Sequence, residues 1–321
     1  MENSSKKKRI KLTSDVKQII LIVAAFTIMI LVFSIGSEYF LKKDNIITIL
    51  ISAVPLGLIA IGECACLVTG VFDMSPGMVA SLAGVIWATL ITQFGMNTWL
   101  AFAIALFFGL FSGAIAGVST AWFMMPAWMS TYALMQIWRG VIMIITGGKA
   151  INMSAYPEFK VLGQTKITNS ITLPILLLII IYVIVYFVFK YTKFGRSLFI
   201  VGGNIEAAKN AGLPVKSIQF FCFVLSGGMA ALGGLVFASR SASANPIIGE
   251  LYAMQAISAT VVGGTKMGGG KANIAMTFIG VLIMVGMQNG LNMIRLPAFY
   301  QYIASGLILF IAVMLQTSRQ N

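Results

Sequence analysis

The sequence predicts an all-α, polytopic membrane protein with about ten transmembrane helices, a break in the region of the second and third helices, and a short helix in a cytoplasmic loop. Two observations concern composition. Hydrophobic residues make up 59% of the 321 residues and charged residues only 10%, whereas soluble domains carry about 25% charged residues. The mean hydropathy is +0.93. Such a chain has too few charges to cover a surface that faces water, so it belongs in a membrane.

The third observation is a series of ten apolar runs, most of them near the ~20 residues that cross a ~30 Å hydrocarbon core. We expect them to form one transmembrane domain over residues 16–316, between a basic tail at 1–15 and a second tail at 317–321. The shortest run lies near residue 257. The runs are Val16–Gly36, Ile46–Thr69, Gly77–Phe94, Thr98–Phe123, Trp128–Thr146, Leu173–Phe189, Ile218–Arg240, Leu251–Gly263, Asn273–Ile294 and Tyr300–Leu315.

The positive charges predict the orientation of these runs. If the N-terminus is inside and the runs alternate, inside segments hold 13 of the 22 Lys and Arg residues and outside segments hold six, with three inside the runs. This bias predicts that both termini and the loop 190–217 are cytoplasmic. The net charge of +13 is spread over these loops, so we expect no nucleic-acid partner.

The stretch TGVFDMSPG at residues 69–77 interrupts the apolar sequence. Ser75 followed by Pro76 predicts a helix start, with Ser75 as the capping hydroxyl, and Asp73 precedes it, where negative charge is favoured. A helix broken at membrane depth is tolerated where it lines a cavity or is buried in protein. We therefore expect Phe72, Asp73 and Ser75 to line a translocation path, with an ordinary short turn as the alternative.

Three ionisable side chains lie inside apolar runs, at Glu63, Arg139 and Arg240. Such groups usually face a bundle interior or a water-filled path. Glu63 lies about two turns before the break, so we expect it to share the translocation path. Arg139 is a candidate partner for Glu63 in the same path. The alternative is that Arg139 and Arg240 extend toward the outer membrane surface, which we expect for Arg240.

Small residues and cysteines suggest structural roles. Gly109, Gly113 and Gly117 recur every fourth residue and predict a surface for close helix packing. Cys64, Cys66 and Cys222 lie in or beside apolar runs, and the chain has no His; we expect buried, inert thiols and no metal or cofactor site in this chain.

The glycine-rich stretch VVGGTKMGGGKA at 261–272 does not fit a phosphate-binding loop. That loop requires G-x4-G-K-[ST], but Thr265 replaces the first glycine and Ala272 replaces the hydroxyl residue. The sequence therefore predicts a tight turn here, and a chain that is not an enzyme and carries no ATPase of its own.

The most basic stretch after the N-terminus is Lys190–Ser217. Asn204 is a candidate helix cap, Glu206 falls in the first turn, and Gly212 and Pro214 end the pattern. This predicts a helix of about two turns that presses into a groove on another protein; the alternative is a solvated loop. The outside loop Thr146–Thr172 is long enough to receive a docking protein, or is only a connector.

With these residues considered, the chain resembles the ribose/xylose/galactoside-type permease family of bacterial ABC importers from about Ile46 to Leu315. The third of the four stretches below is the most specific, because Glu206, Ala207, Ala208 and Gly212 match the EAA-type signature of the family in place and spacing. The stretches are TGVFDMSPGMVASLAG (69–84), WRGVIMIITGG (138–148), FGRSLFIVGGNIEAAKNAGLPV (194–215) with SGGMAALGGLVFASR (226–240), and AISATVVGGTKMGGGKANI with IGVLIMVGMQNGLNM (256–293).

The resemblance implies a permease that works as a pair in the bacterial cytoplasmic membrane. It implies two copies of a cytoplasmic ATPase, which uses the ATP and Mg²⁺, and an extracytoplasmic sugar-binding protein. The helix with Glu206, Ala207, Ala208 and Gly212 would be the coupling helix that enters the ATPase.

The chain departs from the usual family pattern at Phe72 and Pro76, and at Ala253 and Gln255, where relatives carry acidic residues. The substrate therefore stays open, and a nucleoside or a furanosyl signalling molecule is an alternative to a ribose-like sugar. A secondary transporter driven by an ion gradient is a further alternative, for which only Glu63 clearly qualifies as a buried proton carrier.

Overall fold

The computed structural model describes residues 14–168, 171–297 and 299–317. Most of the predicted basic tail (1–15) and of the predicted C-terminal tail (317–321) lies outside these residues. The described chain confirms the all-α class. The helices are α1 (Ser14–Gly36), α2 (Lys43–Val68), α3 (Pro76–Thr92), α4 (Thr98–Ala121), α5 (Ala127–Thr146), α6 (Pro157–Gln164), α7 (Leu173–Tyr191), α8 (Lys193–Gly203), α9 (Ile205–Asn210), α10 (Val215–Ser241), α11 (Tyr252–Val262), α12 (Ile274–Met293) and α13 (Phe299–Thr317), with a 3₁₀ turn η1 (Ile248–Glu250).

Each of the ten apolar runs coincides with a helix, but ten full membrane spans are not confirmed. Within the described ranges, six helices are long and apolar enough to cross a membrane: α1, α2, α4, α7, α10 and α12. The apolar segments Pro76–Thr92, Ile248–Val262 and Phe299–Met314 are shorter. Helix α11 has 11 residues and is about 16 Å long, roughly half the thickness of a hydrocarbon core.

Helix α10 lies at the centre of the larger helix group, against α2, α3 and α4. The predicted glycine stripe on α4 allows one of these close approaches. A Cβ atom added at Gly109 would lie 2.5 Å from the carbonyl oxygen of Gly227, and one at Gly113 would lie 2.8 Å from the Cα of Val224. Glycine is therefore needed on α4 for the two backbones to approach, and the predicted packing role of the stripe is confirmed.

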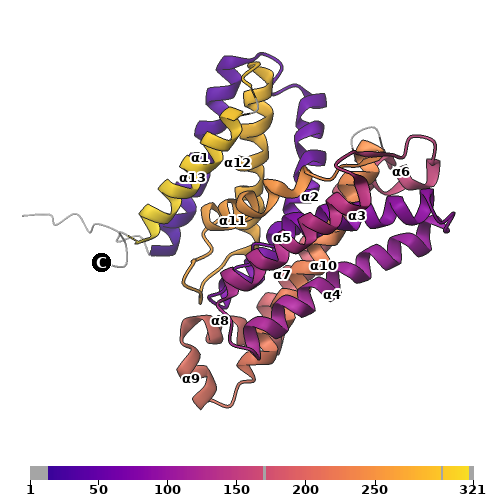
Figure 1. The fold of residues 1–321 in the computed structure, drawn as a ribbon. Coiled ribbons are helices and arrows are strands. Elements are labelled where there is room, and N and C mark those ends of the chain that lie inside the picture. Colours follow the sequence, from indigo (N-terminus) through magenta and orange to yellow (C-terminus); the bar gives the residue numbers. More distant parts are fainter. Residues whose placement is uncertain (1–13, 169–170, 298, 318–321) are drawn as a thin grey trace, which may run out of the picture.

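The two ends of the molecule carry different structures. Figure 1 shows α8 and α9 projecting at one end and α6 at the opposite end. The long segment between α5 and α7 is folded: strand β1 (Ile151–Asn152) pairs antiparallel with β2 (Ser243–Ala244), and Phe159 of α6 stacks on Trp87 of α3 with ring centroids 3.9 Å apart. This segment is thus a packed cap on the bundle, where the sequence left open a docking loop or a connector.

Candidate functional site

The predicted short helix in the loop 190–217 is present as α9. The side chain of Asn204 caps it, with Oδ1 accepting a hydrogen bond from the backbone N–H of Ala207 at 3.0 Å. Gly212 follows the helix with a φ of +76°, a conformation that glycine adopts without steric cost. The sequence pattern therefore located the helix and both of its end signals correctly.

Three of the four residues expected to contact an ATPase are exposed on α9 or just after it. The side chain of Glu206 is 76% exposed and forms an ion pair with Lys209 at 3.0 Å. Ala207 and Gly212 are also exposed, whereas Ala208 is buried against the body of the protein. Ala208 thus attaches the helix to the bundle, and Glu206 is free to contact another molecule.

Helix α8 was not predicted from the sequence. Its signals are present: the Thr192 hydroxyl accepts a hydrogen bond from the N–H of Gly195 at 3.0 Å, and Phe194, Leu198 and Val201 form one apolar face. The spacing of these three residues is typical of a helix face. The three glycines in this short stretch hide the pattern, because glycine is unfavourable in helices.

The end of α8 meets α2 and the glycine-rich turn in a glycine junction, which we define as Gly70, Gly202, Gly269 and Gly270. The N–H of Gly270 donates to the carbonyl oxygen of Val68 at 2.8 Å. A Cβ at Gly202 would overlap that same oxygen, and one at Gly269 would lie 2.7 Å from the carbonyl oxygen of Gly202. Three segments far apart in the sequence therefore touch through their backbones.

The junction also explains the glycine-rich stretch near residue 268. Gly264, Gly269 and Gly270 have φ values of +93°, +84° and +76°, so the predicted tight turn is confirmed. Its glycines serve both the turn geometry and the close approach to α8. A single sequence shows the first requirement, but the second depends on how the helices pack.

The break between α2 and α3 is held by a buried polar cluster centred on Asp73. One oxygen of Asp73 accepts hydrogen bonds from the N–H and the hydroxyl of Ser75, at 2.8 and 2.7 Å. The other oxygen accepts a hydrogen bond from the hydroxyl of Ser226 on α10 at 2.9 Å. Asp73 thus fastens the break to α10, beside the point where Gly62 of α2 packs closely on Ser226.

The predicted helix start at Pro76 is confirmed, but the predicted role of the Ser75 hydroxyl is wrong. Ser75 occupies the cap position without a side-chain cap hydrogen bond. Its hydroxyl donates to Asp73 instead, because that carboxylate lies within reach and is buried. The Ser75 hydroxyl therefore bonds to the Asp73 carboxylate and does not cap the helix.

Glu63 belongs to the same cluster. Its Oε1 accepts a hydrogen bond from the N–H of Asp73 at 3.3 Å, while its Oε2 is buried and has no hydrogen-bond partner among the described residues. Glu63, Asp73 and Ser75 are 0%, 0% and 1% exposed. The structure therefore brings these three predicted residues together in one buried cluster.

The two remaining predicted path residues lie elsewhere. Phe72 is half-buried and packs against an apolar cluster of Leu67, Ile257 and Val261, which joins α2 to α11. Arg139 forms an ion pair with Glu250 of η1 at 2.8 Å, with half of its side chain exposed. The suggested Glu63–Arg139 pair is therefore wrong: Arg139 has a different carboxylate partner, and the partner of Glu63 is a backbone N–H.

Other sequence expectations can be checked in the same region. The three cysteines are free and buried, as expected. Arg240, expected to extend toward the membrane surface, is half-buried and donates from its guanidinium Nη1 to the Ser52 hydroxyl on α2 at 3.0 Å. It therefore makes an interhelical contact, whose partner could not be predicted from the sequence.

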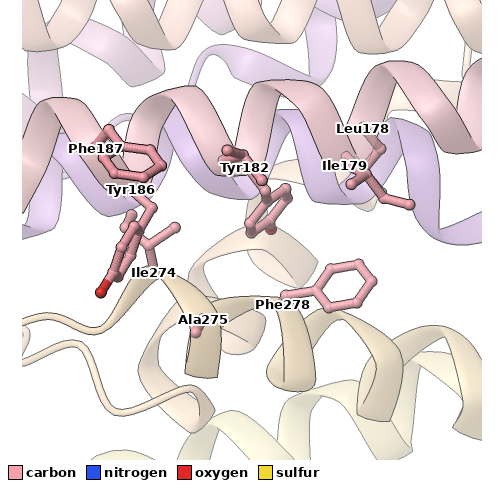
Figure 2. Close-up of a pocket in the computed structure, with 9 residues that line it drawn as sticks. Leu178, Ile179, Tyr182, Tyr186, Phe187, Ile274, Ala275 and Phe278 are labelled. Atoms are coloured by element: carbon pink, nitrogen blue, oxygen red, sulfur yellow. The ribbon is translucent and has the colours of Figure 1, made fainter.

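A surface groove of about 340 Å³ between α7 and α12 is unsuited to a polar substrate. Figure 2 shows its lining side chains, which are apolar or aromatic. The hydroxyl of Tyr182 is directed inward and donates to the carbonyl oxygen of Gly57 at 3.2 Å. With the phenol so engaged, the groove offers a hydrophilic ligand almost no hydrogen-bonding partner and matches a lipid-facing surface.

The fold and these contacts define a multi-pass membrane protein with a projecting helix at one end. A family model described as "Branched-chain amino acid transport system / permease component" matches residues 45–313, so the chain belongs to this family of transport permeases. No solved structure matches the chain.

Curated relatives cover almost all of the chain. The ribose import permease protein of Haemophilus influenzae is 33% identical over 293 residues, 90% of each chain. The ribose import permease protein of Bacillus subtilis is 31% identical and covers 91% of this chain and 90% of its own. The L-arabinose transport system permease protein of Escherichia coli K12 is 34% identical over 83% of this chain and 80% of its own.

Proposed function

We propose that this chain is the membrane-spanning permease subunit of an ATP-binding-cassette importer for a ribose-like monosaccharide. The observation that carries the proposal is α9, a capped helix that projects from the bundle with Glu206 exposed at its surface. Ala208 attaches this helix to the bundle, and its exposed side suits a groove on another protein. The pentose permeases among its relatives support the choice of substrate class.

The remaining parts of the importer follow from this placement. The end with α8 and α9 faces the cytoplasm, where a separate ATPase binds ATP and Mg²⁺. The end with α6 faces outward and receives a sugar-binding protein. A second copy of the permease completes the translocation path, with both termini of each copy in the cytoplasm.

The contacts suggest how movement of the ATPase reaches the membrane. A displaced α9 moves α8, whose end contacts α2 and the glycine-rich turn at the glycine junction. The end of α2 leads directly into the break, and Asp73 connects the break to α10. Closely packed backbones transmit displacement with little loss because protein interiors are densely packed.

Glu63 favours one alternative, a secondary transporter coupled to an ion gradient. A buried carboxylate with one unpartnered oxygen is the kind of group that carries protons in such transporters. The energy source separates the two functions: an ABC importer needs ATP, whereas a secondary transporter needs the gradient.

Uptake of labelled D-ribose and L-arabinose tests the proposal in cells that express the chain with the ATPase and binding protein of its own system. We expect uptake that stops when ATP is depleted and continues in the presence of an uncoupler. Uptake that survives ATP depletion and stops with the uncoupler would instead support the secondary transporter. If neither pentose were taken up, a ribose-like monosaccharide would be excluded as the substrate.

A further inference from the structure

A pocket of about 410 Å³ lies between α2, α10, α11 and α12. Arg240 at the end of α10 places it beside α6, which Figure 1 shows at the end of the molecule opposite α9. Unlike the groove in Figure 2, it is lined by side chains with hydrogen-bonding groups as well as by apolar ones. The lining residues are Ser52, Leu56, Phe237, Arg240, Ser241, Tyr252, Val285 and Gln288.

Arg240 is the only cation among the described residues that line this pocket. The structure gives its guanidinium one side-chain hydrogen bond, to Ser52 at 3.0 Å, and both ion pairs in the described chain involve other residues. A guanidinium has several N–H donors in a fixed plane, so most of them are left for a ligand. The Gln164 side chain donates to the Arg240 carbonyl oxygen at 3.0 Å, which fixes the backbone that carries this side chain.

The other walls fit a neutral polyhydroxyl ring. Gln288 and Ser52 supply both donors and acceptors, as sugar hydroxyls require. Phe237 and Tyr252 pack edge to face, with ring centroids 6.3 Å apart, and so present a rigid aromatic wall to the C–H face of a sugar. A single cation among several acceptors suits a neutral ligand better than a phosphate, which prefers donors alone.

We infer that this pocket is an entry site where a monosaccharide released by the binding protein binds before it crosses the membrane. The inference rests on the proposed import function and adds the residues that contact the substrate on the way in. Arg240 and Gln288 hold the hydroxyls through hydrogen bonds, and Phe237 and Tyr252 support the ring. The folded cap containing α6 lies directly beside the site, because Gln164 of α6 contacts Arg240.

The first test measures transport by the complete importer in proteoliposomes, with D-ribose and L-arabinose as probes. We expect Arg240→Gln to lower the uptake rate about tenfold, the effect of losing hydrogen bonds to a charged group. Arg295→Gln is the matched control, because Arg295 is exposed beyond the end of α12 and does not line the pocket. Gln288→Leu, which keeps the approximate volume, serves if Arg240→Gln does not fold.

The second test measures occupancy directly. Ser241 is exposed at the pocket, so a Ser241→Cys variant is labelled with a maleimide, and the three native cysteines are buried. We expect a transported pentose to slow the labelling by at least about twofold and mannitol to leave it unchanged. Normal uptake by a folded Arg240→Gln or Gln288→Leu variant, or unprotected labelling, would overturn the entry site while wild-type uptake still supports the import function. A wild-type importer that takes up neither pentose would overturn the import function itself.

Discussion

The tip and the base of the α8–α9 projection differ in what surrounds them. At the tip, Glu206 and Lys209 are exposed and form an ion pair only with each other. At the base, Gly202 contacts the carbonyl oxygen of Val68 and the backbone of Gly270. The tip therefore contributes little to the fold of the chain, whereas the base is part of its packed backbone.

This difference separates two ways of stopping transport. A change at the tip affects only a contact with another protein, since exposed ion pairs add little stability. A change at the base alters the packing of α2, α8 and the glycine-rich turn together. Stability and transport should therefore be measured on the same variant. A change at the tip should lower transport alone, whereas a change at the base should lower both.

The largest effect is expected for Gly202→Ala. The added Cβ overlaps the carbonyl oxygen of Val68, and overpacking of this kind typically costs about 1–3 kcal/mol. We expect a lower melting temperature of the purified permease and a loss of pentose uptake. Gly203→Ala is the control, because nothing lies within 4 Å of a Cβ at that neighbouring position. If both variants behaved like the wild type, the glycine junction would have no part in transmitting movement.

The second-largest effect is expected for Glu206→Lys, which should abolish uptake without changing the melting temperature of the permease. The new positive charge lies beside Lys209 and reverses the sign of the charge that α9 presents to the ATPase at position 206. Co-purification of the ATPase and ATP-dependent uptake are the measurements, with membrane insertion and sugar capture by the binding protein expected to remain normal. Lys193→Glu, at another exposed position of the same loop, is expected to keep uptake within about twofold. Normal uptake by Glu206→Lys would exclude α9 as the coupling helix.

The features that could be predicted from the sequence are those marked by residues close to them in the chain. Asn204, Gly212 and Pro214 mark the ends of α9, because caps and terminators act within a few residues of the chain. The same reasoning located Pro76 as a helix start and the turn near Gly269. The all-α class followed from composition, since a chain with so few charges has no other stable surroundings than a membrane.

The contacts between distant segments could not be predicted in this way. Glu63 and Arg139 were paired because both are charged and lie in apolar runs, but the packing places Glu250 beside Arg139. The Asp73–Ser226 hydrogen bond joins residues separated by 153 positions, and nothing in either local pattern marks the other. Helix α8 was missed for a third reason, because its glycines serve close packing and look like helix breakers in the sequence.

A smaller effect is expected for Asp73→Ala in the polar cluster. This change leaves the N–H of Ser75 and the hydroxyl of Ser226 without their acceptor in a buried site, and each unsatisfied group costs about 1–3 kcal/mol. We expect a lower melting temperature and slower uptake, with the ATPase still bound. Asp73→Asn keeps an acceptor oxygen for Ser75 and should recover most of the stability, since its side-chain amide can donate to Ser226. Equal losses in the two variants would show that the negative charge matters more than the hydrogen bonds.

The smallest effect is expected for Phe72→Ala, on the other side of the same break. Phe72 is half-buried against Leu67, Ile257 and Val261, so truncation removes apolar contact and leaves no polar group unpaired. Loss of a partly buried aromatic ring costs less than the ~3–5 kcal/mol of a fully buried one, and Phe72→Leu should cost less still. We expect a modest fall in uptake with normal ATPase binding, because the contact between the break and α11 is loosened while Asp73 still holds the break to α10. If Phe72→Ala slowed uptake more than Asp73→Ala did, movement would pass from the break to α11 rather than to α10.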